Sequence, residues 1–256
     1  MTEHTITMLS VGKSEVPGPE VFWMRRWDEW LPLDFQVAVI RSETSVVLVN
    51  TGPPRDLAPL NGVWETFLGP RSAMTATDED FILSRLREIG ISPDDVTHVI
   101  LTPFQLYTVS NVGLFRNAEI CIAKRGWLHF HSTHAHPHDD RWTSLPKDVL
   151  SELVFDSWDR VRLLEDEDEI VPGVSTWWAG GHHRATIAVE VSTPRGTAVI
   201  SDAFFYLENV LEDHPIGISE NIYESLAAYE RARGAEVILP LYDPSNFIRY
   251  PGGRIA

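Results

Sequence analysis

Short apolar runs alternate with polar turn signals along the chain, and they predict where strands and helices lie. Residues 96–101 form an apolar, β-branched run that predicts a buried strand, and the segment after it is polar. In α/β proteins, loops at the ends of strands commonly carry the functional residues. We therefore expect the loop that begins at Thr102 to carry functional residues.

Other apolar runs predict further strands on both sides of this one. Residues 35–40 and 45–50 flank a short polar stretch, 41–44, which predicts a hairpin. The remaining predicted strands are 6–11, 118–123, 160–164, 174–178, 186–193, 197–200 and 237–241.

Helical spacing is found in two segments. Ile82, Leu86 and Ile89 repeat at helical intervals before Gly90, and Thr77 is the predicted N-cap of that helix. Residues 219–234 predict an amphipathic helix.

Two long segments lack a clear period. Residues 12–34 are rich in Pro, Trp and charge, and they predict irregular structure. Residues 53–77 contain several Pro and Gly residues and predict a lid or a pocket-wall loop. The tryptophans in both segments suit the walls of a site for an apolar or aromatic ligand.

The order of these elements predicts an α/β (α+β) fold. Each half of the chain is rich in strands that are followed by helices, which fits an αββα sandwich of two mixed β-sheets flanked by helices. No repeat or low-complexity linker divides residues 1–256, so we expect a single domain.

Composition narrows the class of protein. The chain has 256 residues, of which 43% are hydrophobic and 23% charged, as in ordinary soluble proteins. A formal charge of −16 argues against nucleic acid or an anionic membrane as partner. We expect a cytoplasmic protein, because the sequence shows no signal peptide and no apolar run of membrane-spanning length. Cys121 is expected to be a buried, inert thiol.

Four blocks of sequence, in order, resemble the metallo-β-lactamase superfamily. The loop after the strand 96–101 reads Thr102-Pro-Phe-Gln-Leu-Tyr-Thr108, in the frame of that family's Thr-His-x-His-x-Asp-His signature. Gly180-Gly-His-His183 resembles its Gly-His-Thr block, and Ile200-Ser-Asp-Ala203 resembles its Gly-Asp block. Leu239-Pro-Leu-Tyr-Asp243 is similar to its Pro-Gly-His-Asp block. Within the superfamily, the chain looks most like the acyl-homoserine-lactone lactonases.

The resemblance implies a two-metal site, and most of its ligand positions hold other residues here. The first metal position would use Pro103, Gln105 and His182, and the second would use Tyr107, Thr108 and Tyr242, with Asp202 bridging. Zinc prefers imidazole, thiolate and carboxylate ligands. We therefore predict that the second site is lost and that the first keeps His182 and Asp202 only.

Three functions fit this interpretation. The first is a hydrolase for a lactone, an ester or a similar small molecule that works through a His182–Asp202 pair without the two metals. The second is a hydrolase that holds one zinc, iron or manganese ion through His182, Asp202 and a recruited group such as Gln105 or His183. The third is a non-catalytic ligand-binding or scaffold protein. In the first, which needs no cofactor, a direct hydrogen bond to Asp202 raises the pKa of His182, so that His182 can activate Thr108 or a water molecule. The predicted catalytic residues are His182, Asp202, Thr108, Tyr107 and Tyr242, and the predicted substrate contacts are Gln105, His183, Tyr206 and Phe104.

The remaining expectations concern partners and surface segments. A small molecule is the expected ligand, and a homodimer is the expected assembly. Residues 129–138 hold five histidines, which we interpret as a solvated loop rather than a metal site. The acidic residues 165–169 are interpreted as an exposed turn.

Overall fold

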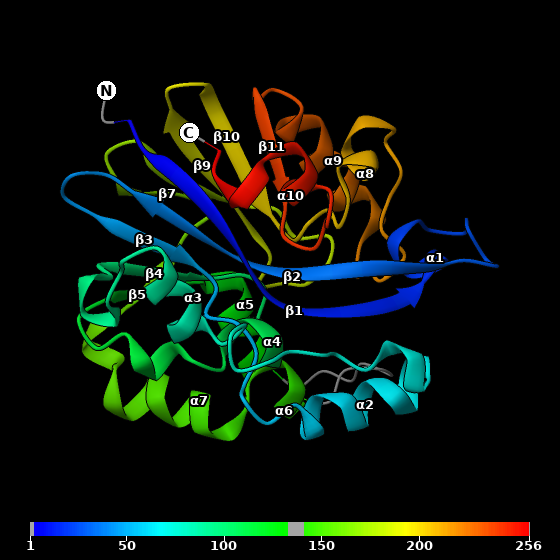
Figure 1. Cartoon of the computed structure of the whole chain (residues 1–256), viewed down its shortest axis with the longest axis horizontal. Helices are drawn as coiled ribbons and strands as arrows, with labels where there is room; N and C mark the ends of the chain where they lie inside the picture. The colour runs from blue at the N-terminus through cyan, green and yellow to red at the C-terminus, as the bar shows by residue number, and fades with distance from the viewer. Residues whose placement is uncertain (1–2, 133–140, 256) are drawn as a thin grey trace.

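The computed structural model describes residues 3–132 and 141–255, and two β-sheets packed face to face form its centre (Figure 1). Six strands make the first sheet, in the order β1-β2-β3-β4-β5-β6, and five make the second, in the order β11-β10-β9-β8-β7. Helices lie on the outer side of each sheet, with α8 and α9 against the second sheet and α3 to α7 against the first. The predicted αββα sandwich is confirmed.

Both sheets are mixed, as predicted. In the first, β1–β2 and β2–β3 are antiparallel, whereas β3 through β6 are parallel. In the second, β7 through β10 are antiparallel and β10–β11 is parallel. The strands are β1 Thr5–Pro17, β2 Trp30–Arg41, β3 Val46–Val49, β4 His98–Leu101, β5 Glu119–Ala123, β6 Val161–Leu164, β7 Glu167–Val171, β8 Val174–Trp178, β9 Ile187–Thr193, β10 Gly196–Ser201 and β11 Val237–Pro240.

The helices are mostly short, and many begin directly after a strand or its loop. The longest described helices are α2 Ala58–Leu68 and α9 Ile222–Ala232. The others are α1 Gly18–Val21, α3 Ile82–Glu88, α4 Leu106–Val109, α5 Lys124–His131, α6 Arg141–Ser144, α7 Lys147–Ser151, α8 Leu207–Leu211 and α10 Asn246–Arg249. No helix within residues 3–132 and 141–255 is long and apolar enough to cross a membrane.

Alternating side chains of the second sheet serve two separate cores. On β9, Ile187, Val189 and Val191 face the first sheet and join the main core between the sheets. Ala188, between them, belongs to a second apolar cluster that also contains Tyr229 of α9. Successive side chains of a strand point to opposite faces, so one strand packs against both layers.

Two segments that were predicted to be irregular are regular. Residues 12–34 continue β1, form α1 and begin β2, and these strands pair from Thr5 and Arg41 out to Pro17 and Trp30. Hydrogen bonds to the partner strand satisfy the backbone groups of this polar, Pro-containing stretch. The spacing of its apolar residues alone does not reveal this pairing. Residues 53–77 were also predicted to lack regular structure, yet they contain α2, whose Pro and Gly residues weakened the helical signal.

Two smaller predictions were wrong. The helix α3 begins at Ile82, and Thr77 is not its cap, because Asp80 accepts hydrogen bonds from the backbone and hydroxyl of Thr77 in a separate turn. The acidic segment 165–169 is not only a turn, because Glu167–Val171 is the edge strand β7. Of the histidines in 129–138, His129 and His131 lie on α5, and the others fall outside the described residues.

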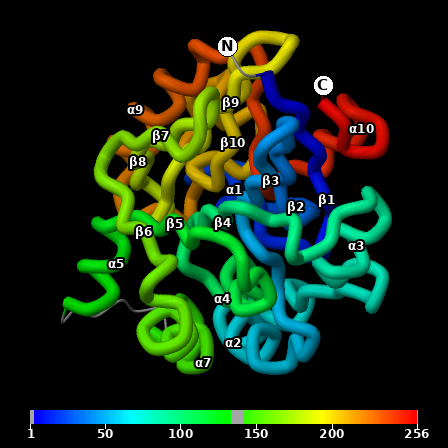
Figure 2. The backbone as a smooth tube through the Cα atoms, turned by 90° about the vertical axis from the view of Figure 1, so that its left-hand side faces the viewer, coloured from blue at the N-terminus to red at the C-terminus, as the bar shows by residue number. Residues whose placement is uncertain are grey.

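The C-terminal segment lies against β1. Figure 2 shows this end of the chain beside the first strand, and Thr7 forms an isolated bridge with Arg254. The backbone N–H of Ile255 donates to the carbonyl of Ile6 at 3.0 Å, an ordinary length for such a bond. The outer edge of β1 is therefore partly covered.

Leu48 provides a test of the main core. It is fully buried on β3 between β2 and β4. Leu48→Ala should lower the free energy of unfolding by about 2–5 kcal/mol, because it removes buried methyl groups and leaves a cavity. Urea unfolding measures this change, with the exposed Thr44→Ala as control at about 0.5 kcal/mol or less. A loss below about 1 kcal/mol for Leu48→Ala would contradict the packing described.

Candidate functional site

A cavity of about 440 Å³ lies at the edge where β4, β8 and β11 end. Sites for small molecules usually have about 300–1,000 Å³, so this volume suits one. Loops after the three strands supply part of its lining, and α2 with the β1–β2 arm supplies another part. The lining residues are Val16, Glu20, Leu33, Phe35, Val63, Trp64, Phe67, Leu68, Gln105, Tyr107, Thr143, His182, His183, Phe205, Gly217, Ile218, Ser219, Glu220 and Tyr242.

The lining has an apolar part and a polar part. Val63, Trp64, Phe67 and Leu68 of α2 form an apolar wall together with residues of β1 and β2. The polar part is built from the strand-end loops and contains Gln105, Tyr107, His182, His183, Glu220 and Tyr242. A ligand that combines an apolar chain with a polar head would match both parts.

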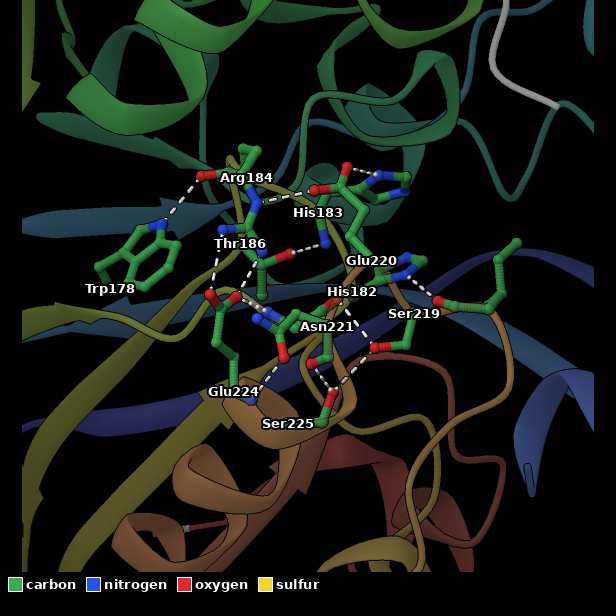
Figure 3. Close-up of polar contacts among 12 residues, drawn as sticks. Trp178, His182, His183, Arg184, Thr186, Ser219, Glu220, Asn221, Glu224 and Ser225 are labelled. Carbon is green, nitrogen blue, oxygen red and sulfur yellow. Dashed lines mark hydrogen bonds and ion pairs between the residues drawn. The ribbon is translucent and has the colours of Figure 1, made fainter. Parts of the chain in front are cut away.

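His182 is held by a glycine turn after β8 (Figure 3). Gly180 and Gly181 have φ angles of 58° and 72°, which glycine adopts at little cost. A Cβ on Gly181 would lie 2.5 Å from Ser225 Oγ, so no larger residue fits without a shift. The turn places His182 inside the protein, where its Nδ1 lies 2.8 Å from the Ile218 carbonyl oxygen.

The ring of His182 is uncharged and has one open nitrogen. Burial, with a smaller effect of the neighbouring His183, lowers the pKa of His182 well below its usual value. A carbonyl can only accept, so Nδ1 carries the proton and Nε2 keeps its lone pair. Within the described part of the chain, His182 Nε2 has no hydrogen-bond partner.

His183 lies beside His182, with ring centroids 4.0 Å apart. Its Nδ1 is 3.6 Å from Glu220 Oε1, and its Nε2 is 3.2 Å from the side-chain nitrogen of Gln105. Burial alone would raise the pKa of Glu220, but His183 and Arg184 outweigh burial and lower it to about 2. The polar part of the cavity therefore contains the ionised carboxylate of Glu220, and Arg184 compensates its negative charge.

Asp202 does not form the predicted pair with His182. It is fully buried, and its two carboxylate oxygens accept hydrogen bonds from the hydroxyls of Thr102 and Thr186, the second at 2.8 Å. Burial raises the pKa of Asp202 to about 6 although both hydroxyls oppose the shift. The expectation of a direct His182–Asp202 bond, with a raised pKa for His182, was wrong, because each side chain is bonded to another group.

The Thr108 hydroxyl likewise forms its hydrogen bonds within its own turn. Its hydroxyl lies 2.7 Å from the carbonyls of Pro103 and Gln105, and it accepts from the Gln105 N–H at 3.2 Å. Its side chain is buried and does not line the cavity. This geometry stabilises the start of α4 and does not present the hydroxyl to a ligand.

Aromatic rings occupy the floor of the cavity near Tyr107 and Tyr242. The ring of Phe35 lies 5.0 Å from Tyr107 and 5.1 Å from Tyr242, and Trp64 lies 5.6 Å from Tyr107. Such edge-to-face and tilted pairs are favourable. Burial raises the pKa of Tyr242 well above its usual value, and nearby Tyr107 and Asp202 add to the effect, so the Tyr242 hydroxyl stays protonated.

Two predicted substrate contacts lie outside this cavity. The hydroxyl of Tyr206 donates to the Pro32 carbonyl at 2.5 Å, and its ring packs against Phe22. Phe104 lines a smaller cavity of about 100 Å³, which shares only His183 and Glu220 with the larger one among the described lining residues. The structure thus brings together Gln105, Tyr107, His182, His183 and Tyr242, and it places Thr108 and Asp202 behind them.

Several site residues were not identified from the sequence. Trp64 was predicted to lie in a pocket wall, but its segment was assigned no regular structure, so the helical face that it shares with Phe67 and Leu68 was not seen. Glu220 precedes the N-cap of α9, Asn221, and only its acidic character gave a signal. Thr102 follows β4 and Thr186 precedes β9, and their hydrogen bonds to Asp202, which span 100 and 16 residues, could not be predicted from the local sequence.

The side chains at the site do not match a two-metal centre. Pro103, Gln105, Thr108 and the two tyrosines supply none of the imidazole or carboxylate ligands that zinc prefers. In residues 3–132 and 141–255, no group of three or more His, Cys, Asp or Glu side chains is placed to hold a metal ion. The open Nε2 of His182 could serve as one ligand, but the oxygens of Asp202 are already bonded to threonines.

Sequence comparison finds relatives of one kind. No family model matches the chain. An N-acyl homoserine lactonase of Bacillus thuringiensis is 23% identical over 180 residues, which is 69% of this chain and 66% of the relative, just under two thirds of its length. The N-acyl homoserine lactonase AiiB of Agrobacterium fabrum is 24% identical over 183 residues, covering 67% of this chain and 63% of the relative.

Solved structures extend the likeness to nearly the whole chain. An N-acyl homoserine lactone hydrolase with the product N-hexanoyl-L-homoserine at its catalytic metal centre has a TM-score of 0.78 at 18% identity, covering 97% of each chain. AidC, a dizinc quorum-quenching lactonase, has a TM-score of 0.69 at 14% identity, covering 99% of this chain and 90% of its own. The hydrolase AbOPH of the beta lactamase superfamily has a TM-score of 0.71, also at 14% identity, covering 98% and 89%.

These findings identify the fold. The two mixed sheets with outer helices are those of the metallo-β-lactamase fold, and the chain resembles the lactonases that share it. The resemblance to the superfamily drawn from four short blocks of sequence is therefore confirmed.

The buried carboxyl of Asp202 provides a test of the site by pH. Its pKa is about 6 in the folded protein and about 3.8 when unfolded, so the folded state binds the proton more tightly. Its contribution to stability is complete below about pH 4 and is lost as the pH rises to about 6, by roughly 3 kcal/mol at most. Urea unfolding at pH 4.5 and 7.5 should show this loss in the native chain relative to Asp202→Asn. A difference between the two proteins that stays constant with pH would contradict the burial of this carboxyl.

Proposed function

We propose that this chain binds and hydrolyses a small acyl lactone, ester or compound of similar shape. The cavity of about 440 Å³, with one apolar and one polar part, carries the proposal. Its place at the ends of β4, β8 and β11, and the lactonases among the relatives, support it. A panel of acyl lactones and esters of different chain length, assayed for binding and for release of the acid, tests it.

The apolar part would hold the acyl chain. Trp64 and Phe67 of α2 and Phe35 of β2 present large apolar surfaces to the cavity. Each CH₂ group that leaves water contributes about 0.8 kcal/mol, so a chain of several carbons is enough to bind.

The polar part would hold the carbonyl end of the ligand. The protonated hydroxyl of Tyr242 can donate to a carbonyl oxygen, and Tyr107 lies beside it. His182 Nε2 offers a lone pair on the same cavity. In this proposal, Asp202 and Thr108 support the site from behind and do not touch the substrate.

We further propose that the reaction does not use two metal ions. Five of the seven ligand positions implied by the family resemblance hold Pro103, Gln105, Tyr107, Thr108 and Tyr242. One zinc, iron or manganese ion on His182 and Asp202 is the alternative, and it would require Asp202 to give up a threonine hydrogen bond. The cytoplasmic location and the homodimer stay predictions from the sequence.

A second candidate function is ligand binding without turnover. The hydrogen bonds of Asp202 and Thr108 favour it, because neither group is free to activate a nucleophile. Binding of an acyl lactone with no release of acid would select this function over hydrolysis.

The apolar wall gives a prediction about chain length. Trp64→Ala should weaken binding of a decanoyl ligand by about tenfold or more and that of a butanoyl ligand much less, because only the longer chain reaches the lost surface. Titration followed by fluorescence or calorimetry measures the dissociation constants of both ligands. The exposed Tyr223→Ala on α9 is the control and should change neither. Equal losses for both ligands would contradict an acyl site at α2.

The donor set gives a prediction about metal. The purified protein, without affinity-tag histidines, should carry well under two equivalents of zinc, iron or manganese by elemental analysis, because the site offers too few imidazole and carboxylate donors. Any turnover should persist in a chelator. Two tightly bound metal ions per chain, or activity lost in chelator and restored by zinc, would refute this part of the proposal.

A further inference from the structure

The strands β1 and β2 form an arm whose tip, residues 22–29, exposes large apolar side chains. The arm extends away from the two sheets, with α1 near its end (Figure 1). Trp23, Met24 and Trp27 at the tip are 47%, 59% and 65% exposed, and none of them lines the cavity. Single apolar side chains on a surface are ordinary, but three within five residues on one protruding tip form a patch typical of an interaction site.

Contacts with the loop around α8 hold the tip in place. The Arg26 guanidinium stacks on Phe22, with Cζ 4.2 Å from the ring centroid. It also bonds to both carboxylate oxygens of Glu208 on α8, at 2.5 and 2.7 Å. The Trp23 N–H donates to the Pro215 carbonyl at 2.9 Å. The backbone of the tip is therefore ordered before any partner binds, which lowers the cost of association.

The backbone of the tip is strained. Met24 and Arg26 have φ angles of 60° and 56°, in the left-handed region that favours glycine. The ring nitrogen of Trp27 donates to the Met24 carbonyl at 3.1 Å, so the two exposed side chains lie on one turn. Strain of this kind is found mostly at functional positions.

The charges at the tip are balanced in a way that suits pairing with an identical surface. Arg26 is compensated by Glu208 and also lies 3.9 Å from Glu29. Arg25 and Asp28 are exposed, and neither forms an ion pair within the described part of the chain. The patch thus carries one cation and one anion to offer, and two copies about a twofold axis can satisfy both.

Other partners match the tip less well. An anionic membrane would meet a chain of charge −16 that offers only Arg25 as an uncompensated cation at this tip. A strongly acidic protein would leave Asp28 unpaired and repelled. The centres of protein interfaces are enriched in Trp, Met and Arg, which is the composition of the tip.

We propose that the tip of the arm is the contact surface of a homodimer. The three exposed apolar side chains of the two copies pack together, and Arg25 of each copy pairs with Asp28 of the other. The homodimer expected from the sequence thereby gains a defined surface, which is separate from the cavity and independent of the proposed function. Small contact areas are typical of weak complexes, so the dimer should dissociate on dilution.

Sedimentation equilibrium of the full chain tests the proposal. The mass of the native protein should rise from monomer to dimer between low and high micromolar concentration. Trp27→Ser should weaken the dimer about tenfold or more, because large aromatic side chains dominate such contacts. Tyr223→Ser is the matched control, since Tyr223 on α9 is 84% exposed, and it should leave the dimer unchanged.

Three outcomes of this experiment would overturn the proposal. The first is a native protein that stays monomeric at every concentration. The second is a dimer that Trp27→Ser does not weaken, which would place the contact elsewhere. The third is a monomer that binds phosphatidylglycerol vesicles through the tip, which would make a membrane the partner.

Charge reversal tests the pairing of the two tips directly. Arg25→Asp and Asp28→Arg should each weaken self-association, because like charges then face each other. The two variants mixed in equal amounts should form a heterodimer, since opposite charges then meet at both contacts. The double variant, which exchanges the two charges, should associate as the native chain does and so shows that the changes do not unfold the tip. A mixture that associates no better than either single variant would overturn the pairing.

Hydrogen exchange gives a test without substitutions. The amides of residues 22–29 should exchange more slowly as the native protein is concentrated, whereas those around Tyr223 should not change. Slowing that spares residues 22–29 while the mass doubles would overturn the proposal.

Discussion

The hydrogen bonds from Thr102 and Thr186 to Asp202 are the contact on which the rest of the site depends. Thr102 follows β4 in the first sheet, and Asp202 follows β10 in the second, so the buried carboxyl joins the two layers at the edge of the cavity. Burying a carboxyl without partners would be costly, and the two hydroxyls offset much of that cost. The Thr102 N–H also donates to Asn50 after β3, and the His183 N–H donates to Thr186. These bonds fix the position of the turn that carries His182 and His183 relative to both sheets.

The residues that stabilise this junction are not the ones that face the cavity. Asp202 and Thr108 lie behind the cavity wall with their hydrogen bonds satisfied by the chain. The groups in front, among them Tyr107 and Tyr242, are packed against Phe35 in an aromatic cluster. Apolar packing and two threonine hydroxyls are thus enough to hold together an edge of the sandwich that carries many polar groups. Loops on a rigid scaffold can change their chemistry in this way without loss of the fold.

The sequence was informative where a pattern is local or where blocks occur in a fixed order. The buried strand 98–101, the hairpin of β9 and β10 and the helix α9 follow from period and turn residues, and the order of four blocks predicted the fold. Failures came where partners far apart in sequence decide the outcome. The pairing of β1 with β2 regularised residues 12–34, and the bond from Thr102 took Asp202 away from His182. Spacing places two residues near one site, but it does not say which hydrogen bond each will make.

The edge strand β7 shows how the same residues can suggest one structure and serve another. Its sequence, Glu167-Asp-Glu-Ile-Val171, is acidic enough to suggest a turn, yet it forms the last strand of the second sheet. An edge strand exposes unpaired backbone groups that can recruit a strand from another molecule, and charged side chains oppose such pairing. Glu167 and Glu169 are exposed at this edge. Arg231 of α9 forms an ion pair with Glu167 at 2.5 Å. The charge at β7 therefore protects the sheet from growing into an aggregate by adding strands from neighbouring molecules.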